Sequence, residues 1–137
     1  MSQKGFTGKG TIFNRWDGSA WQPLAYIRSI SGPDATRETV DVTTLDSAGG
    51  YREFIGSLRD GGSISLGMLF NKSSYADMKS DFESDTLQEY QIVLPDTGNT
   101  TFEFSGLVTD LPMEIPLDDV VTADVTIKIS GETEMSS

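Results

Sequence analysis

Hydrophobic and polar residues alternate with a period of two in several stretches, which is typical of half-buried β-strands. The cleanest example is 120–130, where the apolar residues at odd positions are predicted to face inward. In the same way, Ile64, Leu66, Met68 and Phe70 are predicted to share the buried side of a strand over 64–70. Other strands are predicted at 11–16, 20–30, 40–44, 88–94 and 100–109.

The period changes once, over 72–85, where apolar residues recur at helical spacing. They are predicted to share the inward face of one helix: Tyr75, Met78 and Phe82. An acidic stripe follows the opposite side at Asp77, Asp81 and Asp85. We interpret this stripe as a solvated face, with a cation site as the alternative. Ser74 and Asp77 fit a variant of the capping box at the start of the helix.

About seven strands and one flanking helix predict a mainly β fold, an antiparallel β-sandwich or barrel. The 137 residues fit a single domain over 1–137. Asp17 and Gly18 predict the turn of an N-terminal hairpin, and Pro23 favours an edge position for its second strand. Residues 1–10 are expected to be a flexible N-terminal arm, and the polar residues 131–137 a loose tail.

Residues 45–62 interrupt the pattern with five glycines, charges of both signs and four large apolar side chains. Connections longer than ~12–15 residues are uncommon in compact domains and are usually functional or disordered. A solvated loop does not need Tyr51, Phe54, Ile55 and Leu58, and a packed segment does not need so many glycines. We therefore predict a long flexible loop that becomes ordered against a partner. The alternative is a long hairpin arm folded onto its own domain.

Charge and composition argue against several classes of function, among them nucleic-acid binding and metal-dependent catalysis. The net charge is −11, and residues 1–60 carry seven bases and seven acids, so the whole excess lies in 61–137. A chain this acidic is not expected to grip nucleic acid, because phosphate affinity comes from cationic groups. Cysteine and histidine are absent, which disfavours thiolate metal sites and most acid–base chemistry. No apolar run approaches the ~20 residues of a membrane span. The start of the chain has no hydrophobic signal region, so a soluble protein made in the cytoplasm is expected.

Sequence motifs of enzymes and ligand sites are scarce. There is no G-x-S-x-G elbow, no P-loop and no G-x-G-x-x-G. The pair Asp118 and Asp119 could serve a small glycosidase, but twenty-one acids produce such pairs by chance. Calcium held by these two with Asp124 would lack the order of a calcium loop. Trp16 and Trp21 flank the predicted N-terminal turn and could form a platform for sugar rings, so a carbohydrate-binding β-sandwich module is the alternative function. We expect no enzyme activity, no cofactor and no metal.

The order of segments from residue 26 onward resembles that of the major tail tube proteins of long-tailed (siphophage-type) bacteriophages. The segments that carry the resemblance are Ile30-Ser31-Gly32-Pro33, the run ETVDVTTLDS at 38–47, Arg52-Glu53-Phe54, Asp60-Gly61-Gly62, Phe102-x-Phe104-x-Gly106 and the closing TIKISG at 126–131. No single segment is diagnostic, but their order is fairly specific and extends to Gly131. Related tubes occur in contractile tails and in the type VI secretion system.

The resemblance implies a virion tail protein, assembled in the host cytoplasm, that forms homohexameric rings. Such rings stack into a hollow tube that conducts DNA during ejection without specific binding and without a membrane. It also implies partners at the tail tip (an initiator), in the tape-measure protein and in a terminator. On this basis the loop 45–62 is expected to reach a neighbouring ring. Its contact residues are predicted to be Asp46, Tyr51, Arg52, Glu53, Phe54, Ile55, Leu58, Arg59 and Asp60.

Family architecture further implies that strands of each subunit surround the lumen as one continuous barrel. An outward polar strand face is then predicted to line it. The candidates are Asp41, Thr43, Glu103, Ser105, Asp124 and Thr126.

Overall fold

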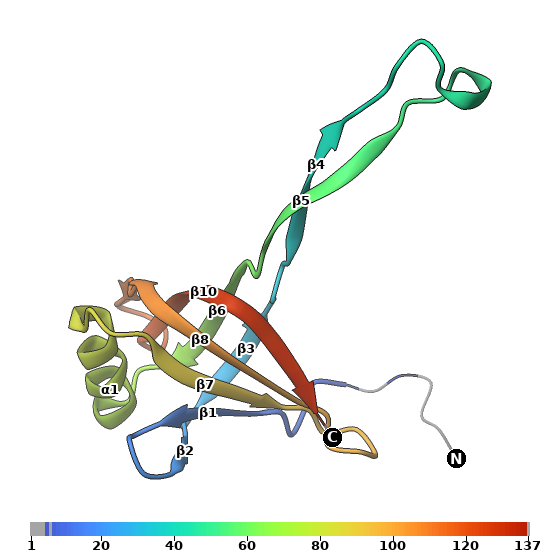
Figure 1. Cartoon of the computed structure of the whole chain (residues 1–137). Helices are drawn as coiled ribbons and strands as arrows, with labels where there is room; N and C mark the ends of the chain where they lie inside the picture. The colour runs from blue at the N-terminus through green and yellow to red at the C-terminus, as the bar shows by residue number, and fades with distance from the viewer. Residues whose placement is uncertain (1–4, 6, 137) are drawn as a thin grey trace.

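The computed structural model describes residue 5 and residues 7–136. The body contains strands β1 (Ile12–Trp16), β2 (Trp21–Pro23), β3 (Ile27–Ser31), β6 (Ser63–Leu69), β7 (Gln88–Val93), β8 (Thr101–Asp110), β9 (Met113–Glu114) and β10 (Thr122–Ser136), and the helix α1 (Lys72–Glu83). A separate arm is built from β4 (Thr36–Asp41), β5 (Phe54–Asp60) and the short 3₁₀ turn η1 (Ala48–Gly50). Figure 1 shows the arm projecting away from the body.

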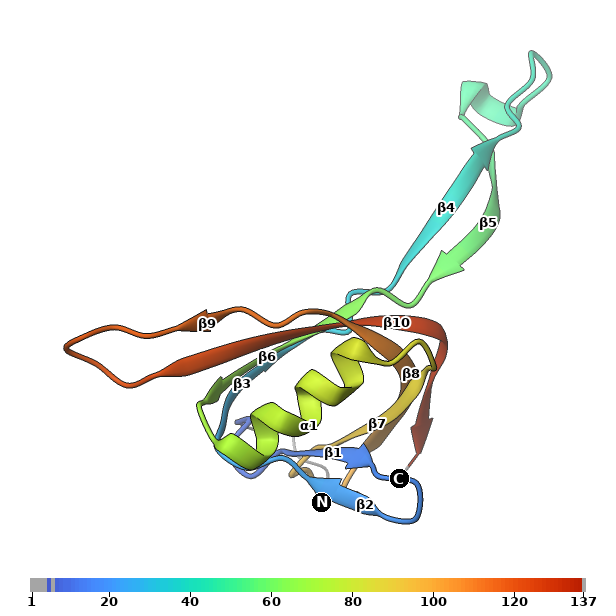
Figure 2. The ribbon, with the colours of Figure 1, turned by 90° about the vertical axis from the view of Figure 1, so that its left-hand side faces the viewer.

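The body strands form one antiparallel sheet in the order β2-β1-β7-β8-β10-β6-β3, with β9 added beside β10. The sheet bends around α1 (Figure 2). It does not close into a barrel, because β2 and β3 remain as its two edges. The prediction of a mainly β, antiparallel fold with one flanking helix is confirmed. Pro23 lies in the edge strand β2, as its missing backbone donor requires.

The core lies between the sheet and α1, and the alternating strands supply it. In β10 the side chains of Ala123, Val125, Ile127 and Ile129 are buried, as predicted. The antiparallel register places them against the buried side chains of β6, for example Val125 opposite Leu66. Burial of one side chain in two along both strands fixes the register, since a slip of one residue would turn every apolar side chain to solvent.

A buried polar cluster fixes α1 to the sheet. Arg15 on β1 donates two hydrogen bonds to the Asp81 carboxylate, at 2.7 and 2.6 Å, and the Tyr90 hydroxyl on β7 donates a third at 2.9 Å. The hydrogen bond to Asp81 raises the pKa of Arg15. Burial raises the pKa of Tyr90, so its hydroxyl keeps the proton that it donates. The prediction that Asp81 lies on a solvated face is therefore wrong, because its charge has a bidentate partner inside the body.

The same cluster changes which face of α1 points inward. Ser74, Met78 and Asp81 are buried, whereas Phe82 is 46% exposed, contrary to the prediction. The helix begins one residue after Asn71, whose side chain accepts a hydrogen bond from the backbone N–H of Ser74 at 3.1 Å. Asn71 is thus the N-cap, and the predicted cap at Ser74 is also wrong.

The arm corrects the predicted loop. Residues 45–62 are not one unstructured connection, because 54–60 form β5, which pairs with β4. The predicted half-buried strand at 40–44 is wrong too, since Val40 and Val42 are exposed. Alternation at these positions reflects a two-stranded ribbon with solvent on both faces. The ribbon projects away from the body, so the alternative of an arm folded onto its own domain is also wrong (Figure 1).

The two ends of the chain differ in how they compare with the prediction. Half of the predicted flexible arm at 1–10, residues 1–4 and 6, lies outside the described residues. Residues 131–136 were expected to be loose, but they continue β10, with Glu134 opposite Glu103 and Met135 opposite Phe102. The pairing uses backbone groups of β8, which do not depend on apolar side chains. A register shift between Ser130 and Glu134 marks a bulge where the strand bends.

Candidate assembly surfaces

The tip of the arm is a hydrogen-bonded structure. The backbone N–H of Val42 donates to the carbonyl of Glu53 at 2.9 Å, and the N–H of Glu53 donates to Thr43 Oγ1 at 2.7 Å. The Ser47 hydroxyl donates to the Glu53 carboxylate at 2.9 Å, which ties the two sides of the tip together. Because these bonds lie within 42–53, the tip has a defined shape before it meets any partner.

An exposed ion pair joins the two strands at the base of the tip. Arg52 donates to Asp41 at 3.1 Å across the end of the ribbon. Hydrogen bonding to Thr43, followed by that to Arg52, lowers the pKa of Asp41. Both side chains are exposed, so the pair contributes little to stability. Its effect is on the geometry of the tip.

The arm carries a continuous series of exposed apolar side chains. The four predicted contact residues Tyr51, Phe54, Ile55 and Leu58 are exposed by 54% to 78%. The structure adds three exposed apolar residues: Val40 and Val42, which are predicted in a half-buried strand, and Leu45, which lies in the predicted loop but is not among its predicted contact residues. Alternation does not distinguish a strand in the main sheet from one in a free ribbon, so it predicts Val40 and Val42 in a half-buried strand. Exposed apolar patches of this kind mark interaction sites.

The predicted charged contacts have different positions. Asp60 at the base of the arm accepts a hydrogen bond from Lys128 on β10 at 2.7 Å, and this bond lowers the pKa of Asp60. Arg59 lies directly opposite Arg37 in the β4–β5 register. Among the described residues neither arginine has an ion-pair partner. Asp46 lies at the exposed tip.

The open face of the sheet, defined as the side away from α1, collects four of the six predicted lumen residues. Ser105 lies opposite Ser130 in the pairing of β8 with β10, and Thr126 lies opposite Ser65 in the pairing of β10 with β6. Glu103 and Asp124 alternate with buried neighbours on the same strands and so share this face. Asp41 and Thr43 are not part of it, because they lie on the arm.

Small hydroxyl side chains and glycine dominate the open face over β3, β6 and the first half of β10. Its residues there are Ser29, Ser31, Ser63, Ser65, Gly67, Thr122, Asp124, Thr126 and Lys128. Lys128 is paired with Asp60, and the exposed Arg28 of β3 lines a pocket together with Ser29, Gly67 and Asp124 of this face. Where β7 and β8 continue the face, Asn14, Gln91 and Glu103 form a chain of side-chain hydrogen bonds at 2.7 and 3.0 Å. The face is therefore mainly polar, with few bases.

Ligand and catalytic sites gain no support from the structure. Trp16 and Trp21 pack edge to face with ring centroids 5.2 Å apart and planes at 69°, so they do not form one flat platform. Across the described residues no group of three or more acidic side chains is arranged to hold a metal ion. No described helix is long and apolar enough to cross a membrane.

Comparison with known proteins gives a family match and several similar folds. A family model for phage tail tube proteins matches residues 34–135. The fold is similar to a chain from the tail of an empty gene transfer agent (GTA) particle refined with C6 symmetry, at 24% identity and a TM-score of 0.80, covering 97% of this chain and 100% of that one.

Two further solved structures have the same fold. A chain from the PVC sheath–tube complex of an extracellular contractile injection system shares 16% identity at a TM-score of 0.70, covering 93% of this chain and 88% of that one. A chain from the SPP1 tail tube shares 6% identity at 0.67, covering 93% and 75%. No curated protein sequence gives a significant match.

Proposed function

This chain belongs to the phage tail tube protein family, and on that premise we propose that six copies close into a ring and that the rings stack into a hollow tail tube. Proteins of this family are structural components of the virion tail, so the chain is a structural protein and not an enzyme. The C6 symmetry of the GTA tail supports six as the number of copies.

The projecting arm is the observation that carries the stacking part of the proposal. The seven residues of β5, at ~3.4 Å each, extend it by about 24 Å before the tip is counted. A two-stranded ribbon with solvent on both faces is only marginally stable alone. Its exposed Tyr51, Phe54, Ile55 and Leu58 have no partner within the described body. A subunit of the next ring supplies such a partner, with these four as anchors and Asp46, Arg52 and Glu53 setting the register.

The open face of the sheet supports the conduit part of the proposal. DNA that must slide past a wall should meet few unpaired cations, because each one neutralises a phosphate and releases counterions. The Ser, Thr and Gly side chains of β3, β6 and β10 meet this requirement. Glu103, Ser105, Asp124 and Thr126 then face the lumen, and DNA passes without specific binding.

The proposal also includes the place and the partners of the tube. The tube belongs to the virion tail of a siphophage-type phage and is assembled in the host cytoplasm. It begins on a tail-tip initiator, surrounds a tape-measure protein and ends at a terminator. The order of segments in the sequence supports the siphophage type. Related tubes seen with a baseplate and with a terminating cap support partners at both ends.

Removal of the arm tip tests the stacking role. Residues 42–53 are deleted, and Asp41 is joined to Phe54 through an Asn-Gly turn, which suits a two-residue hairpin. Electron microscopy and sedimentation velocity follow a concentration series of both proteins. The full chain is expected to form rings and hollow tubes as concentration rises, whereas the shortened chain is expected to form rings that do not stack.

Two results contradict the proposal. A full chain that remains monomeric through the series removes the assembly function. Tubes of normal length from the shortened chain remove the stacking role of the arm. The thermal unfolding of the two proteins at a concentration below assembly is the control, since deletion of an exposed tip should leave the body intact.

A further inference from the structure

A second projection leaves the body far from the arm. It is the hairpin formed by β9, the loop 115–121 and the start of β10 (Figure 2). Ile115 is 68% and Leu117 is 103% exposed, so its apolar residues contact almost nothing in their own subunit. Glu114, Asp118 and Asp119 make it acidic, and 113–121 contain no base. This acidic hairpin has the composition of an interface and not of a solvated loop.

The root of the arm has the complementary character. A groove of about 950 Å³ lies between the base of the arm and the bend of β10, with Pro33, Ala35 and Ile129 in its lining. Its charged residues are the bases Arg37, Arg59 and Lys128 and the acids Asp60 and Glu132. Lys128 is paired with Asp60, which leaves Arg37 and Arg59 as the bases of the groove without an ion-pair partner among the described residues. Arg37 and Arg59 face each other across the ribbon. Like charges directly opposite on paired strands are destabilising. An outside anion at this position removes the repulsion.

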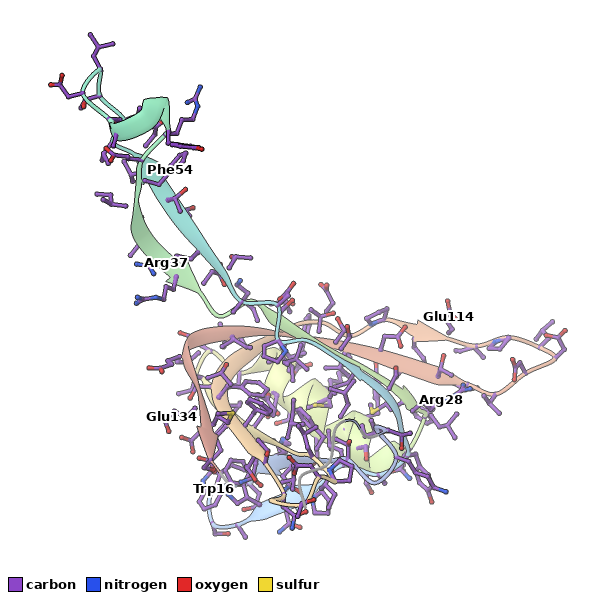
Figure 3. The ribbon with its side chains drawn as sticks, turned by 90° about the vertical axis from the view of Figure 1, so that its right-hand side faces the viewer. Trp16, Arg28, Arg37, Phe54, Glu114 and Glu134 are labelled. Atoms are coloured by element: carbon purple, nitrogen blue, oxygen red, sulfur yellow. The ribbon has the colours of Figure 1, made fainter. Side chains whose placement is uncertain are left out.

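Gly56 holds one of these arginines in place. A Cβ atom at Gly56 would overlap the guanidinium of Arg37, so the arginine lies flat across β5. Figure 3 shows Arg37 on the lower part of the arm, between the body and Phe54. The absence of a side chain at Gly56 thus leaves room for the guanidinium of Arg37 beside the arm root.

The two features also fit in space. In Figure 2 the tip of the acidic hairpin lies on one side of the body and the arm root toward the other, at a similar level along the direction of the arm. Figure 3 shows the same relation from the opposite side, with Glu114 on the hairpin well away from Arg37. When a surface on one side of a subunit binds a different surface on the other side of the next copy, the contact is head-to-tail. Such contacts close into a ring when the rotation from one subunit to the next is a whole fraction of a turn.

We propose that the acidic hairpin of each subunit docks into the arm-root groove of the adjacent copy in the same ring. Asp118 and Asp119 then neutralise Arg37 and Arg59, and Leu117 enters the groove beside Ile129. This inference rests on the proposed function, because it assigns the lateral contact of the ring. It differs from the role of the arm tip, which acts between rings.

Charge exchange tests the pairing. One protein carries Arg37→Glu and Arg59→Glu, a second carries Asp118→Arg and Asp119→Arg, and a third carries all four changes. Each of the first two is expected to raise the concentration needed for ring formation by about tenfold or more, because like charges then meet. The third restores opposite charges and is expected to return toward the unmodified protein. Lys72→Glu with Lys79→Glu is the control, as both residues are exposed on α1.

A disulfide provides the direct readout. The chain contains no cysteine, so Ala35→Cys with Leu117→Cys introduces the only two thiols of each subunit. The single variants Ala35→Cys and Leu117→Cys are the controls, since neither can form the bond between positions 35 and 117. Oxidation of assembled rings is expected to give a covalent ladder of up to six subunits on a non-reducing gel. Oxidation of dilute monomer is expected to give none.

The outcomes separate this inference from the proposed function. Rings and tubes from both charge-reversed proteins at the normal concentration, without a disulfide ladder, overturn the docking and leave the tube function standing. A quadruple variant that assembles no better than either double variant also overturns it. An unmodified chain that forms neither rings nor tubes overturns the tube function and the docking together.

Discussion

Leu58→Ala should weaken assembly without weakening the subunit. Leu58 is 78% exposed on the arm, so its truncation removes almost no buried surface from the free subunit. Complete burial of a leucine is worth about 1.5–3 kcal/mol. Burial of the exposed fraction against a neighbouring ring is therefore worth roughly 1–2 kcal/mol. Because 1.4 kcal/mol is tenfold in an equilibrium constant, the critical concentration for tube growth should rise about 5- to 30-fold.

The measurement is the concentration of unassembled protein left after tubes are pelleted, together with thermal unfolding of dilute subunit. Leu87→Ala is the matched control, since Leu87 is also exposed but lies outside every proposed contact. Leu66→Ala is the opposite control, since this buried residue should cost about 2–5 kcal/mol of folding stability. An unchanged critical concentration for Leu58→Ala, or a large loss of subunit stability, would refute the argument that the arm is an unpartnered interface.

Asp81→Ala should lower the free energy of unfolding by about 3–5 kcal/mol, because it leaves Arg15 inside the body without its carboxylate partner. Phe82→Ala should change it by less than about 0.5 kcal/mol. Urea unfolding measures both variants, and equal effects would contradict the stabilising role of the Arg15–Asp81 pair. Acid should also destabilise the subunit. Lys128 lowers the pKa of Asp60, and Thr100 lowers that of Asp96, so their contribution is complete above the ordinary aspartate pKa of about 3.9 and is lost as pH falls through the lower folded values. Urea midpoints between pH 6 and 2.5 test this, and a midpoint that rises on acidification would contradict it.

Much of the fold could be predicted from local pattern. Burial of every second residue in β6, β8 and β10 follows from alternation, because a strand points successive side chains to opposite faces. The turn at Asp17 can also be predicted from sequence, and in the structure the Asp17 carboxylate accepts hydrogen bonds from the backbone N–H groups of Ser19 and Ala20. Strand alternation and turn residues depend only on neighbours in sequence, so they can be recognised without the tertiary structure.

The identity of the contact residues on the arm could be predicted, but the secondary structure that carries them could not. Tyr51, Phe54, Ile55 and Leu58 were identified because large apolar side chains among glycines and charges have no use in a solvated loop. The hairpin that carries them could not be predicted. Every residue of β4 and β5 is exposed, so their pairing leaves no pattern of buried and exposed positions in the sequence. Gly56 was counted as a source of flexibility, whereas in the structure it makes room for Arg37.

The sequence by itself determined the alternating strands of the body, the helix and the acidic, cysteine-free chemistry, because each is a property of short segments or of composition. Only the tertiary structure decided that Asp81 is buried against Arg15, that Val40 and Val42 are exposed, and that residues 131–136 complete β10. Asp81 is buried by a partner far along the chain, since Arg15 is 66 residues away, whereas Val40 and Val42 are exposed because no part of the body covers the ribbon. Local periodicity reports which way a side chain points, but whether it meets protein or water depends on elements brought together by the fold.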